Sequence, residues 1–455
     1  MCYNNYIKCG RLIYSLRQLF YDESDANIKA VQVYAYACGP IGQKLLQFMV
    51  MHDGFLSSTT KDKLKYIFED CITHSWEETE LIYKEDFDRD IYDDFDIKKS
   101  CKVPIGSGTI GQVYKLYHRE LKQYVALKVR HLDIEVQTAT FIKVVNDILA
   151  VVHRFVLIPF SIMIKEFLNN IECQLDYCLE AYHTNTIRIN CREDTHIIIP
   201  EVYYNSCRVI AMSYHEGTSF LDIADKRLKA VISADMFLFN VSSLMVHDLL
   251  HCDLHYGNWK VLLNDEDEGA YKLIIYDCGI TGSTHNDAIN KKIFMASMDG
   301  DYQQVYEIIA PDMHQQKHGL LMKQYTKEIM DKYYVNTADR FTDFLKQLSV
   351  YQININTAYL RCIQGLLTCL CLLLITAGKL TKILGKDGSR LEVYVCYYGG
   401  VLEKINKYPA LSQYINAWIA SDPTIETVFY NWLDENFGHR DKSVFIDAML
   451  EKLFN

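Results

Sequence analysis

Hydrophobic positions follow helical spacing towards both ends of the chain and strand-like alternation in between. Apolar residues that recur every three to four positions predict helices before residue 100, whereas alternation of apolar and polar residues predicts strands from about residue 103. The first helices are expected over 11–21, 35–51 and 60–70. An acidic helix with its connector is expected over 77–96, as a solvated surface element.

Strands are predicted over 124–129 and 208–212, and helices over 165–185 and 233–250. The apolar segment 149–164 is expected to pack inside the protein. Beyond Gly279 the chain has no Ala-Pro-Glu segment, so the peptide-docking platform of protein kinases is expected to be missing. Further helices are predicted over 288–298, 302–309, 318–334, 339–348, 358–377 and within 390–455.

A glycine-rich run lies inside the region of alternating residues. It has the form GxGxxGxV and comprises Gly106, Ser107, Gly108, Thr109, Ile110, Gly111, Gln112 and Val113. Such glycines let the backbone approach phosphate oxygens, although the run alone also fits a dinucleotide-binding turn or a plain hairpin. The next strand contains Val125-Ala126-Leu127-Lys128, which favours the kinase arrangement, with Lys128 contacting the α- and β-phosphates.

The lysine then needs a carboxylate from a neighbouring helix. Glu180 is the expected partner, and Asp176, one helical turn away, is the second candidate. The linker after strand 208–212 would be the hinge that binds adenine. Met212 at the end of that strand and Tyr214 in the linker complete the predicted nucleotide site, together with Val113 and Ala126 of the earlier strands.

The segment from His251 to Asn258 carries the reacting groups of a phosphotransferase. An aspartate followed five positions later by an asparagine, and then by a strand ending in Asp-x-Gly, is how kinases hold metal ions. We expect Asp253 to receive the proton of an attacking hydroxyl, and Asn258 and Asp277 to bind Mg²⁺. His251 is expected to orient this loop through a backbone hydrogen bond, and His255 to touch the γ-phosphate. The alternative is an ordinary helix–loop–strand with unrelated polar residues.

Composition limits the partners and the compartment. A net charge of -11 argues against nucleic-acid binding. The 15 cysteines form no CxxC pair, which disfavours a zinc ribbon and fits a reducing, intracellular and most simply cytoplasmic setting. The basic start of the chain has too few Ser and Arg for a mitochondrial presequence, so a surface helix is favoured over mitochondrial targeting. The apolar run 365–378 is short for a membrane span and predicts a buried helix.

Over residues 35–380 the chain resembles the UbiB/ADCK (aarF-domain) family of atypical kinases. Three segments carry the resemblance: Gly39-Pro40 with Lys44-Leu45-Leu46-Gln47 is similar to the KxGQ motif, Gln174-Leu175-Asp176 with Glu180 to the ExD segment, and His251–Asn258 to the HxDxHxGN loop. Without the resemblance, Lys44 and Gln47 would be an ordinary polar helix face; with it, they are expected to reach the nucleotide site.

The resemblance implies an α+β, bilobal protein-kinase-like fold, with a small antiparallel-sheet lobe and a helical large lobe. The expected division is an N-terminal helical extension over 1–100, the small lobe over 101–215, the large lobe over 216–390 and a C-terminal helical extension over 391–455. The resemblance further implies that the protein binds ATP or ADP with Mg²⁺ or Mn²⁺. It also implies contact with a lipid or with the surface of a membrane.

The leading hypothesis is therefore an atypical kinase or ATPase linked to isoprenoid or ubiquinone-type lipid metabolism. The alternatives are a small-molecule phosphotransferase of the aminoglycoside- or choline-kinase kind and a non-catalytic nucleotide- or lipid-binding scaffold. The chain departs from the family pattern in three places: Leu46 replaces the glycine of KxGQ, Gln174 replaces the first acidic residue of ExD, and Gly106 and Gly108 lie in a loop that is alanine-rich in the family. These departures predict that the N-terminal extension is held less firmly over the site and that the phosphate loop resembles that of ordinary kinases.

Overall fold

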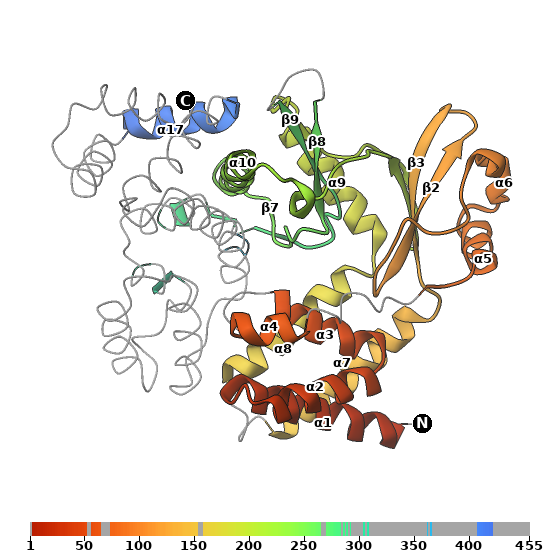
Figure 1. Cartoon of the computed structure of the whole chain (residues 1–455), viewed down its shortest axis with the longest axis vertical. Coiled ribbons are helices and arrows are strands. Elements are labelled where there is room, and N and C mark those ends of the chain that lie inside the picture. Colours follow the sequence, from red (N-terminus) through yellow and green to blue (C-terminus); the bar gives the residue numbers. More distant parts are fainter. Residues whose placement is uncertain are drawn as a thin grey trace.

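The structure is a computed structural model that describes residues 2–51, 56–64, 73–152, 158–264, 270–283 and 407–421, with a few single residues after 283. The predicted α+β class is confirmed. A five-stranded sheet in the order β1-β2-β3-β6-β5 is flanked by helices, and a three-stranded sheet in the order β4-β9-β8 lies in the other lobe. Figure 1 shows the two lobes above a layer of N-terminal helices.

The small-lobe sheet is antiparallel throughout. Its strands are β1 (Gly106–Ser107), β2 (Gly111–His118), β3 (Gln123–Arg130), β5 (Val202–Asn205) and β6 (Val209–Ser213). In β2 and β3, side chains alternate between buried and less buried positions, as expected for strands with one covered face.

Helices α5 (Trp76–Phe87) and α6 (Ile91–Asp94), followed by the short η2 (Ile97–Lys99), cover one face of this sheet (Figure 1). The acidic stretch is not the solvated element that we expected. Tyr83, Ile82 and Trp76 are buried against apolar residues of β2, β3 and β6. Most of the acidic residues occupy the outer side of the helix, and Ser75 and Glu78 form a capping box at its start, so charge and burial occupy different faces.

The chain then forms α7 (Ile134–Val152), α8 (Ile158–Cys173) and α9 (Tyr177–Asn190). The prediction of one helix over 165–185 is wrong. The Asp176 carboxylate accepts a hydrogen bond of 2.9 Å from the Cys178 N–H and so caps a new helix, α9. Gln174 therefore lies beyond the end of α8, and Asp176 and Glu180 are not on one continuous helical face.

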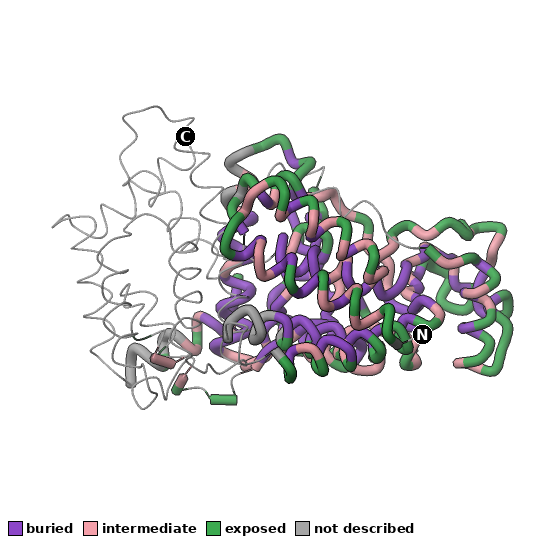
Figure 2. The backbone as a smooth tube through the Cα atoms, turned by 90° about the horizontal axis from the view of Figure 1, so that it is seen from below, coloured by how far each residue is buried: buried purple, intermediate pink, exposed green. Residues whose placement is uncertain are grey.

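In the described residues before α5, the N-terminal extension contains the helices α1 (Cys2–Tyr21), α2 (Asp25–Ala37), α3 (Pro40–Met51) and α4 (Ser58–Leu64). The predicted helix 35–51 is broken at Gly39, whose φ of 73° lies in the left-handed region, and Pro40 opens α3 as expected. Helix α3 contacts α7 and α8, and α1 contacts α7. These helices share one apolar cluster, and Figure 2 shows buried positions running through them.

The large lobe contains η3 (Phe220–Asp222), α10 (Lys226–Met245), β4 (Ile197–Ile198), β7 (Leu250–His251), β8 (Trp259–Leu263), β9 (Tyr271–Ile275), β10 (Thr281–Gly282) and α17 (Pro409–Ser421). The predicted helix 233–250 ends at Met245, because Leu250 and His251 pair with β10 instead. Helix α17 is one of the helices expected after residue 390.

A buried polar network joins α17 to the rest of this lobe. The Asp235 carboxylate accepts hydrogen bonds from the hydroxyl groups of Tyr408 (2.7 Å) and Tyr271 (2.9 Å), and His196 Nε2 lies 3.1 Å away. Nearby, burial raises the pKa of Asp194 to about 6. The residue just before α17 is therefore hydrogen-bonded to the middle of α10.

The helices predicted over 288–298, 302–309, 318–334, 339–348 and 358–377, and the apolar run 365–378, fall almost entirely outside the described residues. Among the helices that the structure describes, none combines the length and the apolarity needed to cross a membrane.

Candidate functional site

Three charged residues from distant parts of the chain meet between the lobes. Lys128 Nζ, on β3, lies 2.8 Å from both carboxylate oxygens of Glu180 in the first turn of α9. The same ammonium lies 3.0 Å from Asp277 Oδ2, just after β9. The Glu180 side chain is 2% exposed and that of Asp277 41%, so Asp277 is the member of the triad that faces solvent. Glu180 is the partner expected from the sequence.

The ammonium of Lys128 dominates the electrostatics of this triad. Burial opposes its charge, but the carboxylates of Asp277 and Glu180 raise the pKa of Lys128 well above its usual value. Burial likewise opposes ionisation of Asp277, yet the Lys128 ammonium outweighs it and lowers the pKa of Asp277 to about 2. Asp277 is therefore a carboxylate across the physiological range.

The loop after β7 holds Asp253 and Asn258 against each other. The Asn258 amide nitrogen donates to the Asp253 carbonyl (2.9 Å) and lies 3.2 Å from its carboxylate Oδ2. The backbone N–H of Tyr276 donates to the Asn258 carbonyl at 2.7 Å. Pairing of β8 with β9 thus sets Asn258 beside the end of β9, two residues before Asp277.

His251 orients this loop as expected. Its Nδ1 accepts the Asp253 N–H at 3.2 Å, which leaves Nε2 to donate to the Tyr276 carbonyl at 3.1 Å. Burial lowers the pKa of His251, which favours this neutral form. His255 folds back on its own loop, where Nδ1 accepts the Gly257 N–H at 3.0 Å and Nε2 lies 3.8 Å from Asp253. A contact of His255 with a γ-phosphate stays a prediction.

The glycine-rich run forms the hairpin of β1 and β2, closed by a 2.8 Å hydrogen bond from the Gly108 N–H to the Gly111 carbonyl. A side chain at Gly106 would meet open space, and one at Gly108 would come no nearer than 3.7 Å to another atom. A Cβ at Gly111 would collide with the Tyr177 hydroxyl and lie 2.5 Å from the Val129 carbonyl. The tip of the hairpin is therefore open, while its base is tightly packed.

The residues predicted to surround adenine lie on adjacent strands. Ala126 pairs with Met212 across β3 and β6, and Val113 pairs with Lys128 across β2 and β3. Tyr214 follows β6, and its ring centre lies 4.3 Å from the Lys115 ammonium.

The N-terminal extension reaches this site through α3. Lys44 lines a cavity of about 20 Å³ together with Asp253 and Gln174. Gln47 is buried, and its amide oxygen accepts a 3.5 Å hydrogen bond from Thr109 at the tip of the glycine hairpin. The structure therefore places Lys44 and Gln47 against the loop and the hairpin, respectively, and their roles in nucleotide binding stay predictions.

Two residues of this region were not identified from the sequence. Asn170 lines the same cavity as Lys44, and its buried Oδ1 has no hydrogen-bond partner in the structure. It lies one helical turn before Gln174, and this spacing could have suggested a shared face. Tyr177 lies with its ring centre 5.0 Å from Lys128 Nζ. Its position next to Asp176 carried no signal that distinguished it from an ordinary core aromatic residue.

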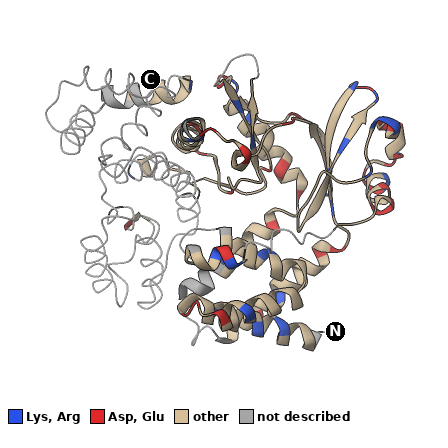
Figure 3. Cartoon of the chain, in the orientation of Figure 1, with Lys and Arg blue, Asp and Glu red and all other residues tan. Residues whose placement is uncertain are grey.

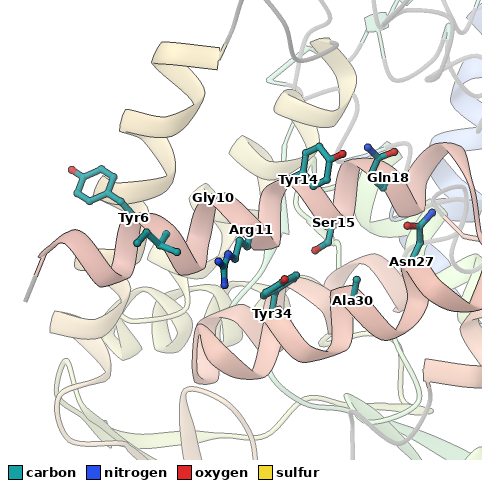
Figure 4. Close-up of a pocket in the computed structure, with 10 residues that line it drawn as sticks. Tyr6, Gly10, Arg11, Tyr14, Ser15, Gln18, Asn27, Ala30 and Tyr34 are labelled. Atoms are coloured by element: carbon teal, nitrogen blue, oxygen red, sulfur yellow. The ribbon is translucent and has the colours of Figure 1, made fainter.

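A second cavity, of about 450 Å³, lies between α1 and α2 at the outer side of the extension. Figure 4 shows Tyr6, Tyr14, Arg11, Ser15 and Tyr34 around it. Figure 3 shows basic but no acidic residues on α1. Among the described residues that line it there is no carboxylate, so the acidic groups of phosphotransferase chemistry are absent from that part of the lining.

The donor set between the lobes suits a nucleotide with its metal ion. The carboxylate of Asp277 and the Asn258 amide supply hard oxygen ligands of the kind Mg²⁺ prefers, and the Asp253 carboxylate lies beside them. The open space at Gly106 and Gly108 leaves the hairpin backbone accessible to phosphate oxygens. The residues present therefore fit both groups.

Comparison with known proteins agrees with the geometry. AarF domain-containing protein kinase 1 of Xenopus laevis is 26% identical over 206 residues, 44% of this chain and 39% of that protein. The probable protein kinase UbiB of Aeromonas hydrophila is 26% identical over 236 residues, 48% of this chain and 41% of that protein. The chain thus spans about two fifths of the length of these two curated relatives.

A solved structure of Mycobacterium tuberculosis Rv3197 with erythromycin matches with coverage of 73% of this chain and 83% of that chain, at 16% identity and a TM-score of 0.46. The model of the ABC1 atypical kinase-like domain matches residues 67–309, more than half of the sequence. The resemblance inferred from the motifs is confirmed, and the chain belongs to the ABC1 atypical kinase-like family.

Proposed function

We propose that the protein is an atypical kinase or ATPase that binds ATP with Mg²⁺ and hydrolyses it or transfers its γ-phosphoryl group. The observation that supports this most directly is the position of Lys128 between Glu180 and Asp277. A lysine held by a helix carboxylate is the group that kinases use to position the α- and β-phosphates. Binding of ADP, and Mn²⁺ in place of Mg²⁺, belong to the same proposal.

Each residue has a separate part in this proposal. Glu180 keeps Lys128 charged and directed at the phosphates. Asn258 and Asp277 would hold the metal ion, which when bound neutralises the charge that develops on the phosphates. Asp253 would orient the acceptor hydroxyl or water and take up its proton at the carboxylate oxygen, while Asn258 keeps that carboxylate in place.

The residues around Asp253 favour a small phosphoryl acceptor over a peptide. Lys44 and Phe48 of α3 and Phe167 of α8 line, together with Asp253, a cavity of about 20 Å³, roughly enough for one water molecule. Water or a hydroxyl group on a slender molecule fits this space better than a protein side chain with its backbone. By family resemblance we further propose a link to isoprenoid or ubiquinone-type lipid metabolism.

The test is a pair of assays on the full chain: thermal shift and hydrolysis with ATP, ADP and GTP, with and without Mg²⁺. A bound nucleotide at a hundred times its Kd should stabilise the wild type by about 2.7 kcal/mol. Asp277→Asn should weaken the Mg²⁺-dependent part of the shift and reduce hydrolysis on the order of a hundredfold. Asp222→Asn, an exposed acid on η3, is the matched control and should behave as wild type.

Asp253→Asn separates catalysis from binding. It should keep the nucleotide-induced shift and lose hydrolysis. Hydrolysis at the wild-type rate in this variant would contradict a catalytic role, and a shift without hydrolysis in the wild type would favour the nucleotide-binding scaffold. A phosphorylated small alcohol, formed without any effect of substitutions in α3, would favour the small-molecule phosphotransferase.

A further inference from the structure

A group of two thiols and one carboxylate lies on the outer side of the helix that carries Glu180. Asp176 caps α9, Cys178 lies in its first turn, and Cys207 lies in the turn between β5 and β6. One ligand atom from each residue lies within 4.8 Å of the other two. The Tyr177 N–H donates to the Cys207 carbonyl at 3.3 Å, which holds the two segments together.

The separation of the two sulfur atoms matches a metal site better than a disulfide. Cys178 Sγ and Cys207 Sγ lie 3.5 Å apart. A disulfide requires about 2.05 Å. Two thiolates bound to one tetrahedral zinc ion, each at about 2.3 Å, lie about 3.8 Å apart. Small side-chain adjustments would therefore bring both sulfurs to zinc-binding distance.

The carboxylate favours a cation as well. Asp176 Oδ1 accepts the Cys178 N–H at the start of α9, and one oxygen of this carboxylate lies within 4.8 Å of both sulfur atoms. The group therefore offers one carboxylate oxygen besides the two sulfur atoms. Cys207 is exposed, so water can complete the coordination.

We propose that Asp176, Cys178 and Cys207 form a binding site for a thiophilic divalent cation, Zn²⁺ in particular, with water as the fourth ligand. The sulfur ligands select zinc over magnesium, so this site differs chemically from the oxygen-rich site at Asp277. Because α9 begins at this site, a bound ion would tie the start of the Glu180 helix to the β5–β6 turn. The proposal stands independently of nucleotide chemistry.

The test uses the full chain, reduced, stripped of metal with a chelator, and titrated with Co²⁺ in the absence of nucleotide and Mg²⁺. Co²⁺ reports sulfur coordination through its thiolate-to-metal charge-transfer absorption. One equivalent should produce this absorption, and Zn²⁺ should then displace it, because tetrahedral sulfur sites favour Zn²⁺. Added Zn²⁺ should also raise the melting temperature of the wild type.

Single substitutions assign the ligands. Cys178→Ser and Cys207→Ser should each weaken binding by at least about tenfold and remove the zinc-induced rise in melting temperature. Asp176→Asn should weaken binding too, although asparagine still caps the helix, so a loss there cannot come from an uncapped α9. Cys101→Ser is the matched control: Cys101 is also exposed but belongs to no such group among the residues that the structure describes, and this variant should bind like wild type.

Two results would overturn the proposal. A charge-transfer absorption equally strong in Cys207→Ser and wild type would place the ion on other cysteines. Isolation from cells of a Cys178–Cys207 disulfide, with no affinity of the reduced protein for Co²⁺ or Zn²⁺, would make the two thiols a redox pair.

Discussion

Lys44 of α3 and Asp253 of the loop after β7 line the same small cavity, with Gln174 in its wall. A neutral amide therefore faces an ammonium group at the junction between the extension and the loop. We expect Gln174→Glu to form an ion pair with Lys44, hold α3 more firmly against Asp253 and slow nucleotide turnover. A tenfold decrease corresponds to about 1.4 kcal/mol in the barrier.

Hydrolysis assays on the full chain check this expectation, together with melting temperatures, which should rise in the Gln174→Glu variant. Gln174→Met keeps the length of the side chain without a charge and is the matched control. Equal or faster turnover in Gln174→Glu would count against the idea that glutamine at position 174 weakens the hold of α3 on the loop of Asp253.

The glycine hairpin should respond differently to alanine at its two ends. Gly111→Ala should destabilise the protein by about 2 kcal/mol or more, because its Cβ collides with the Tyr177 hydroxyl and approaches the Val129 carbonyl to 2.5 Å. Gly106→Ala meets open space, so its stability should stay within about 0.5 kcal/mol of wild type while turnover falls. Thermal unfolding and hydrolysis measured side by side distinguish the two effects; equal stability of the two variants would show that the base of the hairpin can relax.

Asp194 should make stability depend on pH. Burial raises its pKa to about 6, so the folded chain binds this proton more tightly than the unfolded chain. Its contribution to stability is therefore largest at low pH and is lost as pH rises from about 4 through 6. Asp194→Asn imitates the protonated form, so its stability relative to wild type should increase between pH 4.5 and 7, by about 1 to 2 kcal/mol.

Melting temperatures of wild type and Asp194→Asn across this pH range measure the difference directly. A constant difference between the two proteins would mean that Asp194 titrates alike in the folded and unfolded states.

Tyr408→Phe should weaken the attachment of α17. The substitution removes the hydroxyl that donates to the buried Asp235 carboxylate and leaves the apolar ring in place, at an expected loss of about 1 to 3 kcal/mol. Tyr182→Phe, on the exposed face of α9, serves as the control and should be neutral. Limited proteolysis near residues 407–421 should become faster in Tyr408→Phe; an unchanged cleavage rate and melting temperature would show that the hydrogen bond contributes nothing measurable.

The sequence allows the residues of the candidate site to be located because they lie in short motifs with fixed spacing. Lys128 follows a glycine hairpin, and Asp253 precedes Asn258 by five positions, whereas their chemical roles stay predictions. The contacts between the motifs could not be predicted from the sequence. That Gln47 meets Thr109 depends on how α3 packs on α7 and α8, and no local pattern encodes that packing.

The helix boundary before α9 and the burial of the acidic segment differ from the prediction, the first for a local reason and the second for a tertiary one. The chain breaks before α9 because Asp176 caps the new helix. In the sequence, an aspartate among regularly spaced apolar residues fits the interior of a helix equally well. Burial of Tyr83 depends on the neighbouring sheet, whereas the acidic composition around it indicated solvent. In both cases a tertiary contact or a single side-chain hydrogen bond outweighed the average character of the segment.

Tyr177 places its ring 5.0 Å from the Lys128 ammonium, and its hydroxyl lies directly beneath Gly111. The Tyr177 side chain of α9 thus lies between the hairpin and Lys128 and limits how closely the base of the hairpin can approach α9. Because Tyr177 and Glu180 both belong to α9, a tilt of α9 would displace the base of the hairpin together with the carboxylate of Glu180, so movement of the hairpin and loss of the ion pair should occur together.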